Sequence, residues 1–138
     1  MSVETTIRKI LSEAKTIAVV GWSPKAERPS FGVSRYLASK GFRMIAVNPG
    51  QAGGEAFGAP IYASLTEAAK AETIDMVDVF RRSEEAGAVI DEAISIGAKA
   101  VWLQLGVSNP EGEARAKAAG LDVVSNRCPA IEIPRLGL

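Results

Sequence analysis

Short apolar runs alternate with amphipathic segments along the whole chain. The innermost runs, such as Ile17–Val20 and Met76–Phe80, are apolar at nearly every position. Strands covered on both faces have this pattern, whereas a half-solvated antiparallel strand alternates. The pattern therefore predicts buried strands at Thr16–Val20, Arg43–Val47, Asp75–Phe80, Ala100–Leu105 and Asp122–Val124.

Helical periods fill the segments between these strands. Ile7, Ile10, Leu11 and Ala14 recur at the spacing of one helix face. The other four helices are indicated by start signals, in which a proline suits the first turn and a serine or asparagine suits the cap. Those signals are Pro29-Ser30 before Val33, Tyr36 and Leu37, the capping box Ser64–Glu67, Ser83 before Val89, Ile90, Ala93 and Ile94, and Asn109-Pro110-Glu111 opening a helix to Ala119.

A glycine follows three of the helical runs and precedes a strand. Gly41, Gly97 and Gly120 fit the left-handed residue that closes a helix. The repeated order of helix, glycine and strand is typical of βαβ units in a parallel sheet. We therefore expect residues 1–138 to form one α/β domain, a Rossmann-like doubly wound parallel sheet of about five strands flanked by helices.

The composition excludes several classes of function. The 138 residues carry 16 Lys and Arg against 16 Asp and Glu, with one Cys and no His. A zero formal charge argues against a nucleic-acid partner. The absence of His removes His–Cys zinc clusters and Ser-His-Asp triads, so no catalytic or metal residue is predicted. Since no stretch approaches a membrane span or a signal peptide, we expect a cytoplasmic protein.

Polar and basic residues concentrate just after the predicted strands. Ligands of such sheets bind outside the carboxyl ends of the strands, where the strand order reverses. These loops contain one acidic residue, Glu27, and five cations, so the sequence predicts a local site for an anion. The cations are Lys25, Arg28, Arg81, Arg82 and Arg127.

The loop from Gly21 to Ser30 gives the strongest single signal. Its glycine allows the backbone to approach a phosphate, and the helix that follows offers free N–H groups. An ordinary solvated loop is the alternative interpretation. The dinucleotide fingerprint is absent because Ser23 and Ala26 stand where it needs glycine. Asn48 also occupies the place of the acid that holds an NAD ribose, which disfavours a nicotinamide cofactor.

Five motifs resemble, in order and over nearly the whole chain, the small stand-alone coenzyme A-binding domain proteins. That family is similar to the coenzyme A-binding domain of the succinyl-CoA synthetase α subunit, whose catalytic histidine sits in a second domain. This chain has neither the histidine nor that domain. The motifs are Ala18–Lys25 with Arg28-Pro29-Ser30, Val47–Gly50, Asp78–Ser83, Val101–Gly106 and Asn126–Pro129.

The resemblance implies a cofactor, coenzyme A (CoA), and a role for each loop. The loop after the first strand would wrap the pyrophosphate, and the end of the second strand would flank the adenosine. The end of the third strand would form the opposite wall. A cation beside the adenosine suits the 3′-phosphate of CoA. The implied binding residues are Gly21, Trp22, Ser23, Lys25, Arg28, Pro29, Ser30, Asn48, Pro49, Phe80 and Arg81.

Some other residues have two possible roles. Cys128, beside Arg127, could form a mixed disulfide with the CoA thiol, or it is an unreactive, partly buried thiol. Trp102 is expected in the core, and Arg82 is expected either at the anion site or paired with Glu84 or Glu85. Structural roles in turns and hydrogen bonds are favoured for Asp75 and Asp78 over acid–base catalysis. An exposed tail at Ile131-Glu132-Ile133 could pack on its own domain or on a second copy.

These observations favour a domain that binds CoA or an acyl-CoA and has no catalytic activity of its own. One alternative is a CoA-carrying component of an acyl-CoA synthetase-type enzyme, which requires a protein partner. A second alternative is an NAD(H)-binding sensor. A pure interaction scaffold would leave the polar loops unexplained. A protein partner or a homo-oligomer is compatible with the sequence.

Overall fold

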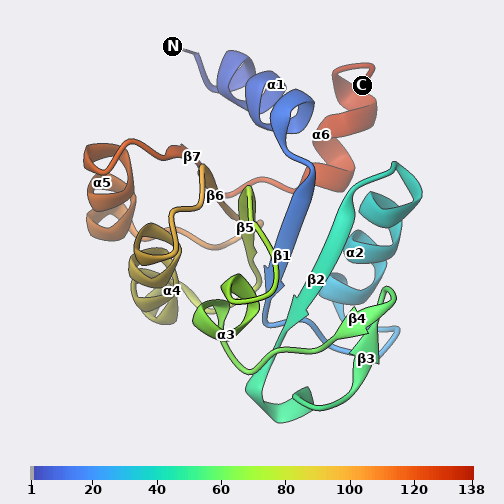
Figure 1. Ribbon diagram of the computed structural model, residues 1–138. Coiled ribbons are helices and arrows are strands. Elements are labelled where there is room, and N and C mark those ends of the chain that lie inside the picture. Colours follow the sequence, from blue (N-terminus) through green and yellow to red (C-terminus); the bar gives the residue numbers. More distant parts are fainter. Residues whose placement is uncertain (1) are drawn as a thin grey trace.

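A five-stranded parallel sheet forms the centre of the computed structural model, which describes residues 2–138 (Figure 1). The strand order is β2-β1-β5-β6-β7, so the chain leaves the first strand to one side and later returns to its other side. Ligand sites of doubly wound sheets lie at this reversal, here between β1 and β5. The strands are β1 (Thr16–Val20), β2 (Arg43–Val47), β5 (Met76–Val79), β6 (Ala100–Leu103) and β7 (Asp122–Val124).

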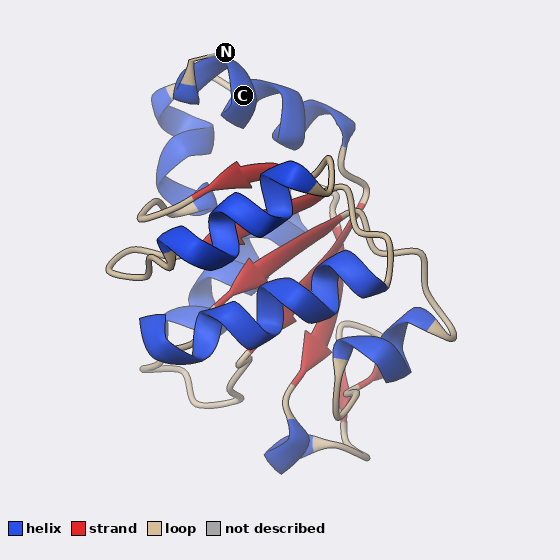
Figure 2. Ribbon diagram, turned by 90° about the vertical axis from the view of Figure 1, so that its left-hand side faces the viewer, coloured by secondary structure: helices blue, strands red, loops and turns tan. Residues whose placement is uncertain are grey.

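Three helices cover each face of the sheet, and each face has its own hydrophobic core (Figures 1 and 2). Alternate residues of one strand enter different cores: Ile17 and Val19 pack with one set of helices and Ala18 with the other. This two-sided burial explains the unbroken apolar runs of the strands. The first set is α1 (Val3–Glu13), α2 (Pro29–Ser39) and α6 (Pro129–Arg135), and the second is α3 (Leu65–Ala69), α4 (Ser83–Ser95) and α5 (Pro110–Ala118).

The fold class predicted from the sequence is confirmed, and three of the five strands have the predicted bounds. The third strand is shorter by one residue at each end, although Phe80 N still donates to Val20 O at 2.9 Å. The fourth ends at Leu103, two residues early, which moves Gln104 and Leu105 into the loop at the strand end. This shift matters for the site described below.

All five predicted helices form, and two begin differently from the prediction: α2, and α4, whose first residue is Ser83 with Arg82 before it. The Ser64 and Asn109 side chains accept hydrogen bonds from backbone N–H groups in the first turns of α3 and α5. Ser30 is not the cap of α2, because Arg28 precedes the helix and Pro29 is its first residue. The glycines after α2, α4 and α5 have positive φ angles of 96°, 76° and 91°, which is the predicted helix-closing conformation: Gly41, Gly97 and Gly120.

Four elements were not predicted, namely three small ones after β2 and the helix α6. A 3₁₀ turn η1 (Pro49–Gln51) and a two-stranded hairpin of β3 (Glu55–Ala56) and β4 (Ala59–Pro60) follow β2. Ile131-Glu132-Ile133 forms part of the helix α6 rather than a tail, and of the two expected alternatives it packs on its own domain. Of these three residues, Glu132 and Ile133 are buried and Ile131 is exposed.

Among residues 2–138, no helix is both long enough and apolar enough to cross a membrane. The same residues contain no group of three or more His, Cys, Asp or Glu placed to hold a metal ion.

A candidate ligand cleft at the strand ends

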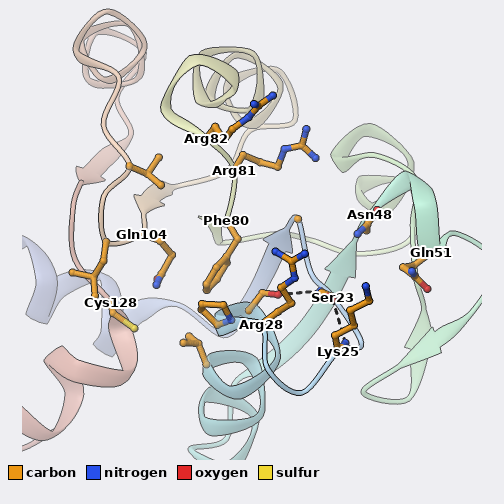
Figure 3. Close-up of a pocket in the computed structure, with 16 residues that line it drawn as sticks. Ser23, Lys25, Arg28, Asn48, Gln51, Phe80, Arg81, Arg82, Gln104 and Cys128 are labelled. Atoms are coloured by element: carbon orange, nitrogen blue, oxygen red, sulfur yellow. Dashed lines mark hydrogen bonds between the residues drawn. The ribbon is translucent and has the colours of Figure 1, made fainter.

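One large cleft of about 740 Å³ lies at the carboxyl ends of the parallel strands (Figure 3). Loops that follow all five strands of the main sheet contribute to it, and it is centred on the reversal between β1 and β5. Nine of the eleven predicted binding residues line it: Gly21, Ser23, Lys25, Arg28, Pro29, Ser30, Asn48, Phe80 and Arg81. The cleft is completed by Val33, Gln51, Arg82, Gln104, Leu105, Val107 and Cys128.

Gly21 sets the close approach of the two central loops. Its φ of 89° is a left-handed conformation that favours glycine, and its N–H donates to Val47 O at 2.9 Å. A Cβ atom at this position would collide with the backbone carbonyl of Phe80. The loop after β1 can therefore pass against the loop after β5 only with glycine here.

Internal hydrogen bonds fix the rest of the first loop. The Ser23 N–H donates to Ser30 Oγ at 3.0 Å, and the Lys25 N–H donates to Ser23 Oγ at 3.2 Å (Figure 3). Ser30 itself is 3% exposed, so the loop is anchored to the first turn of α2. Ser23 is one of the implied binding residues, and its N–H already has a partner within the loop.

Lys25 and Arg28 are the exposed cations of this loop. Neither forms an ion pair with a carboxylate in the described part of the chain. Arg28 immediately precedes α2, whose first residues Pro29 and Ser30 also line the cleft. Two cations and the positive end of a helix dipole therefore face the same space, an arrangement that favours phosphate.

The other loop cations are paired with carboxylates. Arg81 and Arg82 both hydrogen-bond Glu85, and together they hold the pKa of its carboxyl below the usual range, Arg82 most strongly. Arg127 Nη1 lies 2.9 Å from Glu132 Oε1. The expected pairing of Arg82 is thus confirmed, and the surplus positive charge of the cleft is concentrated on Lys25 and Arg28.

Asn48 ties the second strand end to the first. Its Nδ2 donates to Trp22 O at 2.7 Å, and its Oδ1 accepts from Gly50 N at 2.8 Å. These bonds make Asn48 a positioning residue for both loops. Trp22 and Pro49 do not line the cleft: the Trp22 side chain is 5% exposed and packs edge-on against Phe57, while Pro49 is an exposed residue that begins η1.

A neutral end of the cleft was missed in the sequence. Gln104 and Cys128 lie on one side of Phe80, whereas Lys25, Asn48 and Gln51 lie on the other (Figure 3). The missed residues at this end include Leu105 and Val107 from the same loop as Gln104. The available signal for the end of the strand was the polar Gln104 within an apolar run, whereas the predicted strand continues to Leu105.

Cys128 is a buried thiol, 6% exposed, in the wall of this neutral end. It directly precedes α6. Trp102 is fully buried as expected, and its indole N–H donates to Arg127 O at 2.8 Å, which fixes the backbone next to Cys128. Whether the thiol forms a mixed disulfide with CoA stays a prediction.

Comparison with known proteins identifies the family. The sequence profile of a family described as "CoA binding domain" matches residues 15–134. This match covers most of the chain and all five strands of the main sheet. The chain belongs to the CoA-binding domain family. The resemblance inferred from the motifs is therefore confirmed.

Relatives of this CoA-binding domain protein match it along nearly its full length. The uncharacterised protein YneT of Bacillus subtilis (strain 168) is 38% identical over 122 residues, which cover 88% of this chain and 87% of YneT. A hypothetical protein from Pyrococcus horikoshii OT3 superposes with a TM-score of 0.90 at 37% identity, covering 100% of this chain and 94% of its own. Cell-free ID.343 from Thermus thermophilus gives a TM-score of 0.90 at 40% identity, with 99% of both chains covered.

Proposed function

We propose that the cleft binds CoA or an acyl-CoA. The observation that carries the proposal is the pair of exposed cations Lys25 and Arg28, which have no carboxylate partner within residues 2–138 and face the cleft beside the start of α2. A cluster of this kind suits the phosphates of a nucleotide. Membership of the CoA-binding domain family supports CoA as that nucleotide.

The ligand would lie along the strand ends. Its pyrophosphate would bind over the loop Gly21–Ser30, and its adenosine would bind toward Asn48 and Gln51. Phe80 would form the opposite wall. Lys25 or Arg28 would read the 3′-phosphate, which CoA carries and NAD lacks. The pantetheine arm would then extend toward the far end of the cleft.

The end of β2 argues against NAD as the ligand. Dinucleotide domains usually place an acid there to accept the ribose hydroxyls. Here the position is held by Asn48, whose Nδ2 and Oδ1 already bond Trp22 O and Gly50 N. The residue therefore serves the loop and offers a ribose no carboxylate.

Binding without chemistry is part of the proposal. The ionisable side chains that line the cleft are four cations and one thiol: Lys25, Arg28, Arg81, Arg82 and Cys128. General acid–base catalysis near neutral pH uses a group such as His or a carboxylate. Such a lining can hold the phosphates of an acyl-CoA, but it offers the thioester of that ligand no His or carboxylate as a proton acceptor.

Arg28→Glu tests the assignment of the phosphate end. Losing a charge-assisted contact and gaining repulsion should cost at least ~1.5 kcal/mol, or roughly tenfold in CoA affinity measured by calorimetry. Arg35→Glu is the matched control, because Arg35 lies over the Phe31 ring on the same helix and outside the cleft. Equal affinities for the two variants would refute the assignment.

A further inference from the structure

The neutral end of the cleft contains a buried polar side chain, that of Gln104. The residue is 6% exposed, and its Oε1 has no hydrogen-bond partner among residues 2–138. A buried carbonyl oxygen left unpaired costs free energy that native proteins usually avoid. Its amide extends into the space between Phe80 and Cys128 (Figure 3). Gln104 thus brings to the wall of the cleft a carboxamide whose oxygen is unpaired.

The walls around Gln104 are apolar. Val107, whose N–H donates to the Gln104 backbone carbonyl at 2.9 Å, lines the cleft and is 8% exposed, and Val33 from α2 lines the same cleft. Leu105 is 56% exposed, and of the four exposed large hydrophobic residues in the described chain it alone lines the cleft. Ligand pockets are lined mainly by apolar side chains, and Leu105 gives this end of the cleft an apolar surface that a ligand can cover.

These features specify the chemistry of the occupant. A carboxamide offers one acceptor and two donors, so it can pair with both the N–H and the carbonyl of a ligand amide. The apolar walls suit methyl and methylene groups, and the charged end of the cleft lies on the other side of Phe80. The group that fits is an uncharged, flexible chain containing amides, attached to a phosphate-bearing head.

The geometry points to Gln104 as the residue that recognises the amide-bearing pantetheine arm, an inference that rests on the proposed binding of CoA. Gln104 is then a specificity-determining residue. It separates CoA from nucleotides that share the adenosine and phosphates but lack the arm. Within residues 2–138 its Oε1 has no partner, and an N–H of the arm would supply the missing donor once the carboxamide turns toward the cleft.

The test compares two ligands and two variants by calorimetric titration. The ligands are CoA and 3′-phospho-ADP, which is CoA without its arm. The variant Gln104→Met keeps an unbranched side chain of similar length and removes the hydrogen bonds. We expect it to weaken CoA binding about tenfold and to leave 3′-phospho-ADP binding unchanged within about twofold.

Gln51→Met is the matched control, because Gln51 lines the cleft on the opposite side of Phe80. It should change the affinities for the two ligands by the same factor. A second readout is the denaturation midpoint of the unliganded protein. Gln104→Met should hold or raise it, because the variant removes an unpaired buried oxygen, whereas loss of a merely structural residue would lower it.

Two results would overturn the inference, and only the second would also overturn the proposed binding of CoA. If Gln104→Met weakens both ligands equally or neither, Gln104 does not recognise the arm, while CoA binding itself stands. If wild-type protein binds neither CoA nor 3′-phospho-ADP, the proposed function fails as well.

Discussion

Asp78 is a fully buried carboxyl in the middle of β5, two residues before Phe80 of the cleft. Neither of its oxygens has a hydrogen-bond partner among residues 2–138. Its neighbours in the sheet are Val19 and Trp102, which offer no charge. Burial raises the pKa of Asp78 well above its usual range, so the folded protein holds this group protonated where the unfolded chain ionises it.

This shift predicts how stability depends on pH. Because the folded state binds the extra proton, Asp78 lowers the free energy of unfolding as pH rises from about 4 toward the folded pKa, by up to about 1.4 kcal/mol per pH unit. Asp78→Asn has a similar shape and no titration. Chemical denaturation of both proteins between pH 4.5 and 7 should therefore show the variant gaining stability relative to wild type. Parallel curves would contradict the buried, protonated carboxyl.

Backbone roles were predictable from the sequence, and side-chain partners were less so. Gly21 lies after an apolar strand, which already indicated a tight approach. The place of Arg81 after a strand predicted a residue of the cleft, but not that its guanidinium also meets Glu85 one helical turn ahead. Gln104 was missed because the exact end of β6 depends on its neighbours in the sheet.

Among the elements, the long periodic segments were predicted best. The strands and five helices carry their own apolar patterns and caps. Helix α6 does not: its seven residues include Pro129 and Pro134, and Ile131-Glu132-Ile133 alternates as a strand does. The helix is held by tertiary packing, since Ile133 is buried in the core shared with α1 and α2. Glu132 adds local hydrogen bonds with Arg135 and Arg127, which lower its pKa, Arg135 most strongly. The packing partners of Ile133 are invisible in a local pattern.

The packing of α6 gives a matched pair of substitutions. Ile133 is 2% exposed in the core formed with α1 and α2, whereas Ile131, in the same helix, is 52% exposed. Ile133→Ala should lower the free energy of unfolding by about 2–4 kcal/mol through lost burial and a cavity. Ile131→Ala should change it by no more than about 0.5 kcal/mol. Equal effects in urea denaturation would show that α6 is not packed as described.

At the scale of the whole molecule, strand order turns scattered loops into one site. The order β2-β1-β5-β6-β7 lays the five strand ends side by side, so residues from Gly21 to Cys128 line a single cleft. The sequence predicted the repeated βαβ units and hence a ligand site at the carboxyl ends of the strands. It did not predict the division into a cationic end and a neutral end, because that division depends on which loop cations find carboxylate partners.

Parallel calorimetric titrations of the protein with CoA, 3′-dephospho-CoA and NAD test the central claim most directly. The account predicts that CoA binds at least about tenfold more tightly than either of the others, since a cation reads its 3′-phosphate. Binding of NAD alone, or of none of the three ligands, would contradict the claim that this cleft is a CoA site.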